Sequence, residues 1–159
     1  MSFNKNIARQ LTNPWKMRLW MLRRLPMGMI SGMKIESLDE NGCKVVLEDR
    51  FWIRNPFGSV FWAVMGMAAE LSTGALIHAY VSGTNIKYIL TGVKGEFLKK
   101  VRGKSFYFCH SGQEVERKLR TLNSPGETFT ISLPVTAHDQ AGQMVASFEF
   151  YWQLKRTDK

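Results

Sequence analysis

Residues 55–74 read N-P-F-G-S-V-F-W-A-V-M-G-M-A-A-E-L-S-T-G, and this stretch decides the fold. A turn at 55–58 opens it, and residues 59–81 then form a run that is apolar on nearly every side. A run of that length can cross a bilayer. However, Glu70 lies at its centre, and a carboxylate in hydrocarbon costs about 2.5–3.5 kcal/mol. The many alanines and glycines of the run instead favour a helix inside a protein core, with other segments packed closely around it.

The chain on both sides of this helix has the pattern of β-strands. Residues 33–39 and 43–49 are predicted as two strands joined by a turn that contains Asn41-Gly42, a dipeptide typical of β-hairpins. Further strands are predicted at 86–101, 104–111, 127–138 and 143–155, with a short helix at 113–122. In the last strand the aromatic side is expected to face the core, since one residue in two is apolar (Ala146, Phe148, Phe150 and Trp152). The pattern predicts one α+β domain in which a sheet wraps around a long helix.

Composition agrees with a single globular domain. The chain has 159 residues, of which 45% are hydrophobic and 22% charged, so global disorder is not expected. Cys43 and Cys109 have no metal-ligand spacing and do not make a disulfide framework, which favours a reduced, cytoplasmic location. The net charge of +9 is uneven, because residues 1–35 contain seven basic side chains and no acidic one. The rest is nearly neutral, and no nucleic-acid partner is expected.

The basic N-terminal segment, residues 1–30, is predicted to be separate from the domain at 31–159. Between Pro14 and Pro26 lies an amphipathic helix, with Asn13 as its N-cap. Its apolar residues recur at i, i+4 and i+7 (Trp15, Leu19 and Leu22), and Lys16, Arg23 and Arg24 share another side. Two interpretations remain open: contact with an anionic membrane or a phosphate-bearing ligand, or a helix that closes one end of the core. An acid-free amphipathic start also occurs in mitochondrial transit peptides, but this one is poor in serine.

Several other catalytic or metal-binding patterns are absent. Gly103-Lys104-Ser105 is similar to the end of a phosphate-binding loop, but the required earlier glycine is Leu98. The segment 70–74 has a serine and glycine of a nucleophile elbow, but it lies inside a helix. The histidines are not spaced as ligands, so no metal is expected (His78, His110 and His138).

Glu70 remains as the candidate catalytic residue. An ionised carboxylate inside an apolar helix must either accept hydrogen bonds or have a raised pKa. A desolvated glutamate with a raised pKa is suited to act as a general base toward water. The alternative is a structural carboxylate that accepts hydrogen bonds from serine or threonine hydroxyls or from backbone N–H groups.

These features resemble the hotdog-fold acyl-CoA thioesterases, in particular the phenylacetate-pathway (PaaI-like) branch and its uncharacterised relatives. The resemblance covers about residues 30–155 and rests on the hairpin, the long apolar helix and the quoted stretch. In that branch an asparagine precedes the helix and the catalytic Asp or Glu follows fifteen residues later, which is the spacing of Asn55 and Glu70. The resemblance implies the hotdog fold, with a sheet wrapped around the central helix and the N-terminal amphipathic helix as an addition.

The resemblance also implies roles for individual residues. Glu70 would be the base or nucleophile, and Asn55 would orient the attacking water or the thioester. The backbone N–H near Trp62, at the helix N-terminus, would stabilise the oxyanion. Thr91 would place a hydroxyl beside the thioester. The active enzymes commonly have His-Gly-Gly where this chain has Phe61-Trp62-Ala63. Trp62 is therefore expected either to form the bottom of a short acyl pocket or to fill that pocket.

The expected function is hydrolysis of an acyl-CoA or acyl-carrier thioester, with no cofactor apart from the coenzyme A of the substrate. A homodimer is implied, with shared active sites, and a tetramer remains open. Basic side chains are expected either to meet the phosphates of coenzyme A or to form a solvated rim (Lys94, Lys99, Lys100 and Arg102, with Lys104). One alternative is a catalytically silent hotdog module that binds acyl chains or coenzyme A. The other is a membrane-surface or nucleic-acid binder that uses the N-terminal helix.

Overall fold

The computed structural model describes residues 2–158. Its helices are α1 (Lys5–Thr12), α2 (Pro14–Arg24), α3 (Pro26–Ser31), α4 (Trp62–Val81) and α5 (Gly112–Leu119), and a 3-10 turn covers Phe51–Ile53. Its strands are β1 (Lys34–Leu38), β2 (Cys43–Glu48), β3 (Ile86–Phe97), β4 (Lys104–Cys109), β5 (Thr128–Asp139) and β6 (Met144–Arg156). Every strand and helix predicted after residue 32 is present, with ends that move by a few residues.

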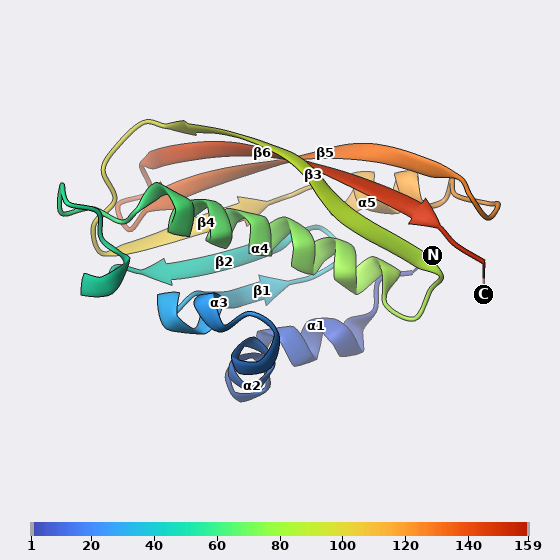
Figure 1. Cartoon of the computed structure of the whole chain (residues 1–159), viewed down its shortest axis with the longest axis horizontal. Coiled ribbons are helices and arrows are strands. Elements are labelled where there is room, and N and C mark those ends of the chain that lie inside the picture. Colours follow the sequence, from blue (N-terminus) through green and yellow to red (C-terminus); the bar gives the residue numbers. More distant parts are fainter. Residues whose placement is uncertain (1, 159) are drawn as a thin grey trace.

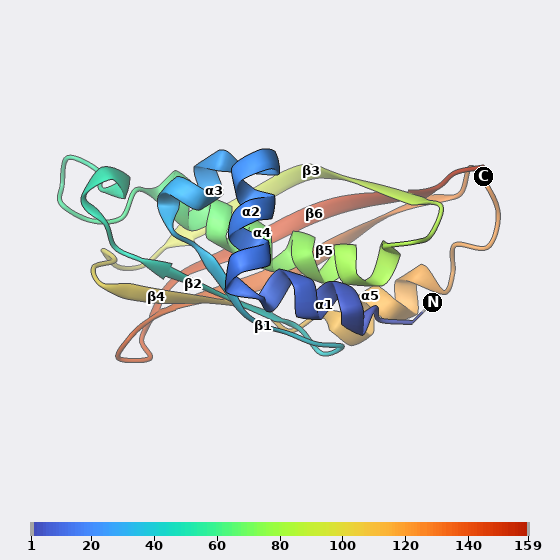
Figure 2. The ribbon, with the colours of Figure 1, turned by 90° about the horizontal axis from the view of Figure 1, so that it is seen from below.

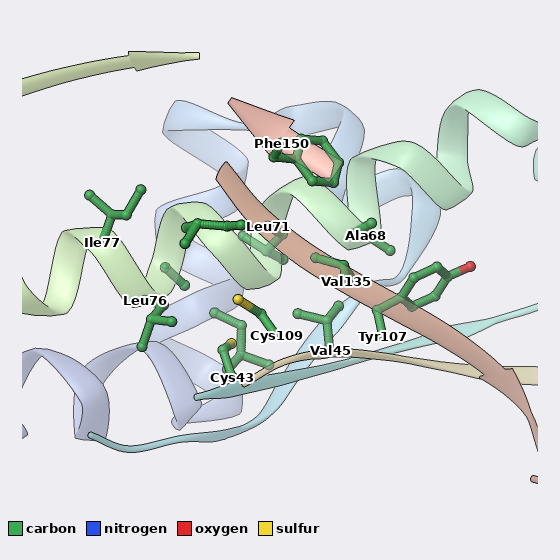
Figure 3. Close-up of a cluster of buried hydrophobic side chains, with 14 of the residues drawn as sticks. Cys43, Val45, Ala68, Leu71, Leu76, Ile77, Tyr107, Cys109, Val135 and Phe150 are labelled. Atoms are coloured by element: carbon green, nitrogen blue, oxygen red, sulfur yellow. The ribbon is translucent and has the colours of Figure 1, made fainter. Parts of the chain in front are cut away.

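The strands form one antiparallel sheet in the order β1-β2-β4-β5-β6-β3, and α4 lies along the side around which the sheet curves (Figure 1). Most of α4 is buried, and Leu76 and Ile77 have no exposed surface. Figure 3 shows side chains of α4 facing the sheet residues Val45, Tyr107 and Phe150. This is the α+β arrangement that the sequence predicts.

The side of β6 that faces the core is also as predicted. Ala146, Phe148, Phe150 and Trp152 are buried, whereas the intervening residues are half-buried. A strand places successive side chains on opposite faces, so a sheet with one face against a helix gives this alternation.

The first hairpin forms between β1 and β2, but its turn is not the two-residue type that Asn-Gly favours. Leu38 pairs with Cys43, which leaves residues 39–42 as the connection. Neither Asn41 nor Gly42 has a positive φ, as a type I′ turn requires. Gly42 is needed for space instead, because a Cβ there would lie 2.2 Å from the carbonyl oxygen of Cys109.

The N-terminal segment contains three short helices instead of the single one predicted. Asn13 caps α2 as expected, since its Oδ1 accepts hydrogen bonds from the N–H groups of Trp15 and Lys16. Figure 1 shows α1–α3 beside β1, and Figure 2 shows α2 crossing in front of α4. The α2 helix packs on the domain through Met17 and Met21, which are buried.

Cys43 and Cys109 are direct partners across β2 and β4, and both are free and buried. Burial, the largest cause, raises the pKa of both thiols. No helix within residues 2–158 has the length and hydropathy of a membrane-spanning segment.

Candidate active site around Glu70

One side of α4 is only partly covered by the sheet. Gly66, Glu70, Gly74 and His78 recur every four residues, which places them on the same side of the helix, and all four are half-buried. A Cβ built on Gly66 meets no atom within 4 Å, whereas one on Gly74 would lie 3.4 Å from Oε1 of Glu70. The carboxylate therefore lies over Gly74, and open space remains beside it toward Gly66.

The carboxylate of Glu70 is desolvated without a compensating partner. Burial raises its pKa, and no residue within 2–158 donates a hydrogen bond to it or pairs with its charge. The nearby hydroxyls are used elsewhere, because Ser72 Oγ donates to the carbonyl oxygen of Ala69 (2.7 Å) and Thr73 Oγ1 donates to that of Glu70 (2.9 Å). This arrangement differs from a structural carboxylate, whose oxygens would accept bonds from such groups.

His78, Tyr88, Trp152 and Thr73 form a polar wall beside Glu70. His78 Nδ1 and the hydroxyl of Tyr88 share a hydrogen bond of 3.1 Å, and Trp152 Nε1 donates to Thr73 Oγ1 at 3.0 Å. Burial lowers the pKa of His78, which favours the neutral imidazole, and burial followed by the charge of Glu70 raises the pKa of Tyr88. The spacing of His78 from Glu70 could have revealed its position, but Tyr88 reaches this wall only through the placement of β3.

Asn55 shapes the loop that precedes α4. Its Oδ1 accepts hydrogen bonds from the N–H groups of Phe57 (3.0 Å) and Ser59 (3.2 Å) and from Ser59 Oγ (3.3 Å). The side-chain oxygen is therefore engaged within the loop, and a role for Asn55 toward water or a thioester stays a prediction.

The N-terminus of α4 carries free backbone donors. Phe61 is the N-cap and provides no side-chain hydrogen bond, and the N–H groups of Trp62 and Ala63 have no acceptor within residues 2–158. The exposed ring of Trp62 packs edge-on against Phe61 and Phe97, at centroid distances of 5.7 and 6.3 Å. Trp62 precedes Glu70 by eight residues, or about 12 Å along the helix axis. One chain therefore does not bring these two groups to the same carbonyl.

Thr91 lies in a β-bulge of β3. Leu90 pairs with Trp152 and Gly92 with Tyr151, so Thr91 is the extra residue. Its Oγ1 donates to the carbonyl oxygen of Tyr151 at 2.9 Å. The hydroxyl stabilises the bulge, and its predicted place beside a thioester stays a prediction.

The predicted basic residues have different neighbours. Lys94 pairs with Glu96 (3.6 Å), and Lys99 pairs with Asp139 (3.7 Å) at the end of β5. In the same way, Lys104 pairs with Glu48.

Lys100 and Arg102, in contrast, lie next to the loop before α4. The ammonium of Lys100 is 5.9 Å from the ring centre of Phe57, and the guanidinium of Arg102 occupies the space above Gly58. Neither forms an ion pair within residues 2–158. A contact between these two cations and a phosphate of coenzyme A stays a prediction.

A separate cavity of about 560 Å³ lies away from Glu70, between the N-terminal helices and the β1–β2 hairpin. Its apolar lining includes Met17, Met21 and Val46. No group of three or more His, Cys, Asp or Glu side chains within the described residues is arranged to hold a metal ion.

Comparisons with known proteins agree on the fold. The family described as "Domain of unknown function (DUF4442)" matches residues 15–154. A search of curated protein sequences finds no significant match. A Pseudomonas aeruginosa protein of unknown function, described as a probable thioesterase, is 16% identical, with a TM-score of 0.74 over 92% of this chain and 99% of that one. A Haemophilus influenzae thioesterase is 11% identical, with a TM-score of 0.68 over 89% and 90%. These likenesses show the hotdog fold.

Proposed function

The chain belongs to the DUF4442 family and has the hotdog fold, and from this premise we propose that it hydrolyses thioesters of acyl-CoA or an acyl carrier. Glu70 is the base that activates water. The structural neighbours that are described as thioesterases support this reaction class. The free thiols of Cys43 and Cys109 favour the reducing cytoplasm as the place of action.

The observation that carries the proposal is the state of Glu70. A half-buried carboxylate that has a raised pKa and receives no hydrogen bond within residues 2–158 is costly for folding and suited to accept a proton. No atom lies within 4 Å of a Cβ built on Gly66, one helix turn before Glu70, so the helix surface there is open to an approaching molecule.

The reaction needs only a water molecule besides the substrate. Glu70 takes a proton as the water oxygen bonds to the thioester carbonyl carbon, and the carbonyl oxygen becomes an oxyanion. When this oxyanion collapses, the carbon–sulfur bond breaks and the proton passes from Glu70 to the departing sulfur. The products are a carboxylic acid and a free thiol.

The distance along α4 supports a homodimer as the active form. Glu70 and the N–H of Trp62 are about 12 Å apart in one chain, so the oxyanion donor would come from Trp62 of the partner subunit. The β3 strand is an edge of the sheet, twelve residues long, and Ile89, Val93 and Phe97 on it are exposed. Such an edge requires pairing or cover, and a second β3 would extend the sheet across the dimer.

A catalytically silent binding module is the second candidate. The rings of Phe61, Trp62 and Phe97 gather at the N-terminus of α4, where active relatives commonly have His-Gly-Gly. A large side chain there can keep a thioester carbonyl away from the backbone donors while the fold still binds an acyl chain.

The two candidates can be separated by measuring the release of free thiol from acyl-CoA substrates of short, medium and long chain. Hydrolysis by the wild type that falls by about 10²-fold or more in Glu70→Gln supports the proposal. Glu36→Gln is the matched control, because Glu36 is an exposed residue of β1. If no substrate is turned over but acyl-CoA still binds, the silent module is correct.

A further inference from the structure

The α2 helix is apolar on two opposite sides, and the domain covers only one of them. Met17 and Met21 face the core. With 100° between successive residues, Trp15, Leu19 and Leu22 lie within about 60° of one another on the other side of the helix. Their exposed fractions are 78%, 54% and 56%. The i, i+4, i+7 pattern that the sequence analysis identified is therefore a stripe that points into solvent.

The next helix, α3, also carries exposed apolar side chains. Met27 and Ile30 of α3 are also more than half exposed, and Trp20 and Met29 are exposed to a smaller extent. Proteins that do not bind at such a surface rarely leave so many large apolar side chains side by side in water. The helices α2 and α3 that carry these side chains lie beside β1 in Figure 1.

Cations lie on both sides of the stripe. Arg18 follows it on one side, over the ring of Trp15, and Lys16 and Arg23 follow it on the other. No acidic residue occurs before Glu36, and these cations form no ion pair within residues 2–158. A cavity of about 440 Å³ lies between α1, α2 and His78 of α4, and the α2 side of its lining carries three basic groups (Lys16, Arg23 and Arg24). It provides room for an anionic headgroup next to the apolar stripe.

We propose that the exposed face of α2 and α3 binds the surface of an anionic phospholipid bilayer. A bilayer interface supplies both requirements, since acyl chains bury the tryptophan and leucine side chains while phosphates neutralise the cations. A second copy of the chain fits less well. If two copies met through the same stripe, their basic groups would face one another with no carboxylate in the segment to separate them. This proposal does not depend on thioester hydrolysis.

The test is co-sedimentation of the full chain with vesicles. One set contains phosphatidylcholine alone and the other contains about 30 mol % phosphatidylglycerol, and salt is raised from about 0.05 M to about 0.5 M. We expect binding to the anionic vesicles only, with a clear loss at high salt. Equal binding to both vesicle types, or to neither, would overturn the proposal.

Matched variants locate the surface. Leu19→Ser should weaken binding about fivefold, because a half-exposed leucine loses its transfer into the interface, while Leu98→Ser, at 57% exposure elsewhere, should not. Arg23→Gln should also weaken binding about fivefold, and Arg117→Gln on α5 should not. All four positions are exposed, so the fold should persist, and thermal unfolding checks this. Equal effects of each variant and its control would contradict the assignment. A change of oligomeric state in Leu19→Ser without any loss of vesicle binding would instead identify a protein interface.

Discussion

Replacing Glu70 by glutamine should stabilise the folded protein at pH 8 while it removes hydrolysis. Burial without a partner raises the pKa of Glu70, so near neutral pH the folded state bears the cost of a desolvated carboxylate. Uncompensated polar burial costs about 1–3 kcal/mol in proteins, and for a half-buried group we take the lower end, about 1 kcal/mol. In a domain of this size that corresponds to a rise in Tm of about 2–4 °C.

The dependence of folding stability on pH tests the direction of this prediction. Because the folded pKa of Glu70 lies above the unfolded one, the wild type has its full stability below the unfolded pKa and loses part of it as pH rises through the folded pKa. The advantage of Glu70→Gln should therefore be present at pH 8 and shrink toward pH 5. Thermal unfolding at several pH values measures it, with Glu40→Gln as the control, because Glu40 is exposed and forms no ion pair within residues 2–158. A variant that is less stable than the wild type at pH 8, or an advantage that is independent of pH, would refute the desolvation argument.

Three other substitutions test the packing at the site and at the start of α5. Thr73→Val removes the acceptor of the Trp152 indole N–H. The free energy of unfolding, measured by urea denaturation, should therefore fall by about 1–3 kcal/mol. Gly112→Ala places a Cβ 2.0 Å from the carbonyl oxygen of Glu40, and the same measurement should show a loss of about 1–3 kcal/mol; a smaller loss would mean that the backbone relaxes. Gly66→Ala should stabilise α4 by about 0.8–1.0 kcal/mol, since no atom lies within 4 Å of its Cβ. The same variant should slow hydrolysis, because the methyl group fills the space on the Glu70 side of the helix. Unchanged turnover would mean that the substrate binds elsewhere.

Most of the domain could be predicted because its elements bury regular patterns. The strand β6 alternates because one face of the sheet meets α4, and α4 is apolar all round because it lies inside the curved sheet. The orientation of α2 could not be predicted in this way. Both of its sides are apolar, and only the assembled domain determines that Met17 and Met21 are buried while Trp15 and Leu19 are not.

The site was predictable only in part. Glu70 is conspicuous because a carboxylate interrupts an apolar helix, and its position at mid-helix follows from the sequence. Tyr88 and Trp152 reach the same wall through the register between β3 and β6, a long-range pairing that local patterns do not determine. Asn55 has the spacing of a catalytic residue, yet its Oδ1 holds the loop, because the turn requires an acceptor for the N–H groups that follow.

The two cysteines have a practical consequence for enzymology. Cys43 and Cys109 face each other across β2 and β4, away from solvent, and burial raises the pKa of both thiols. Chromogenic disulfide reagents react with thiolates, so the native protein should add almost no background colour when such a reagent is used to measure released coenzyme A. Under the same conditions, slow colour development without substrate would show that the sheet opens and exposes the two thiols. The assay would then also measure how much of the protein stays folded.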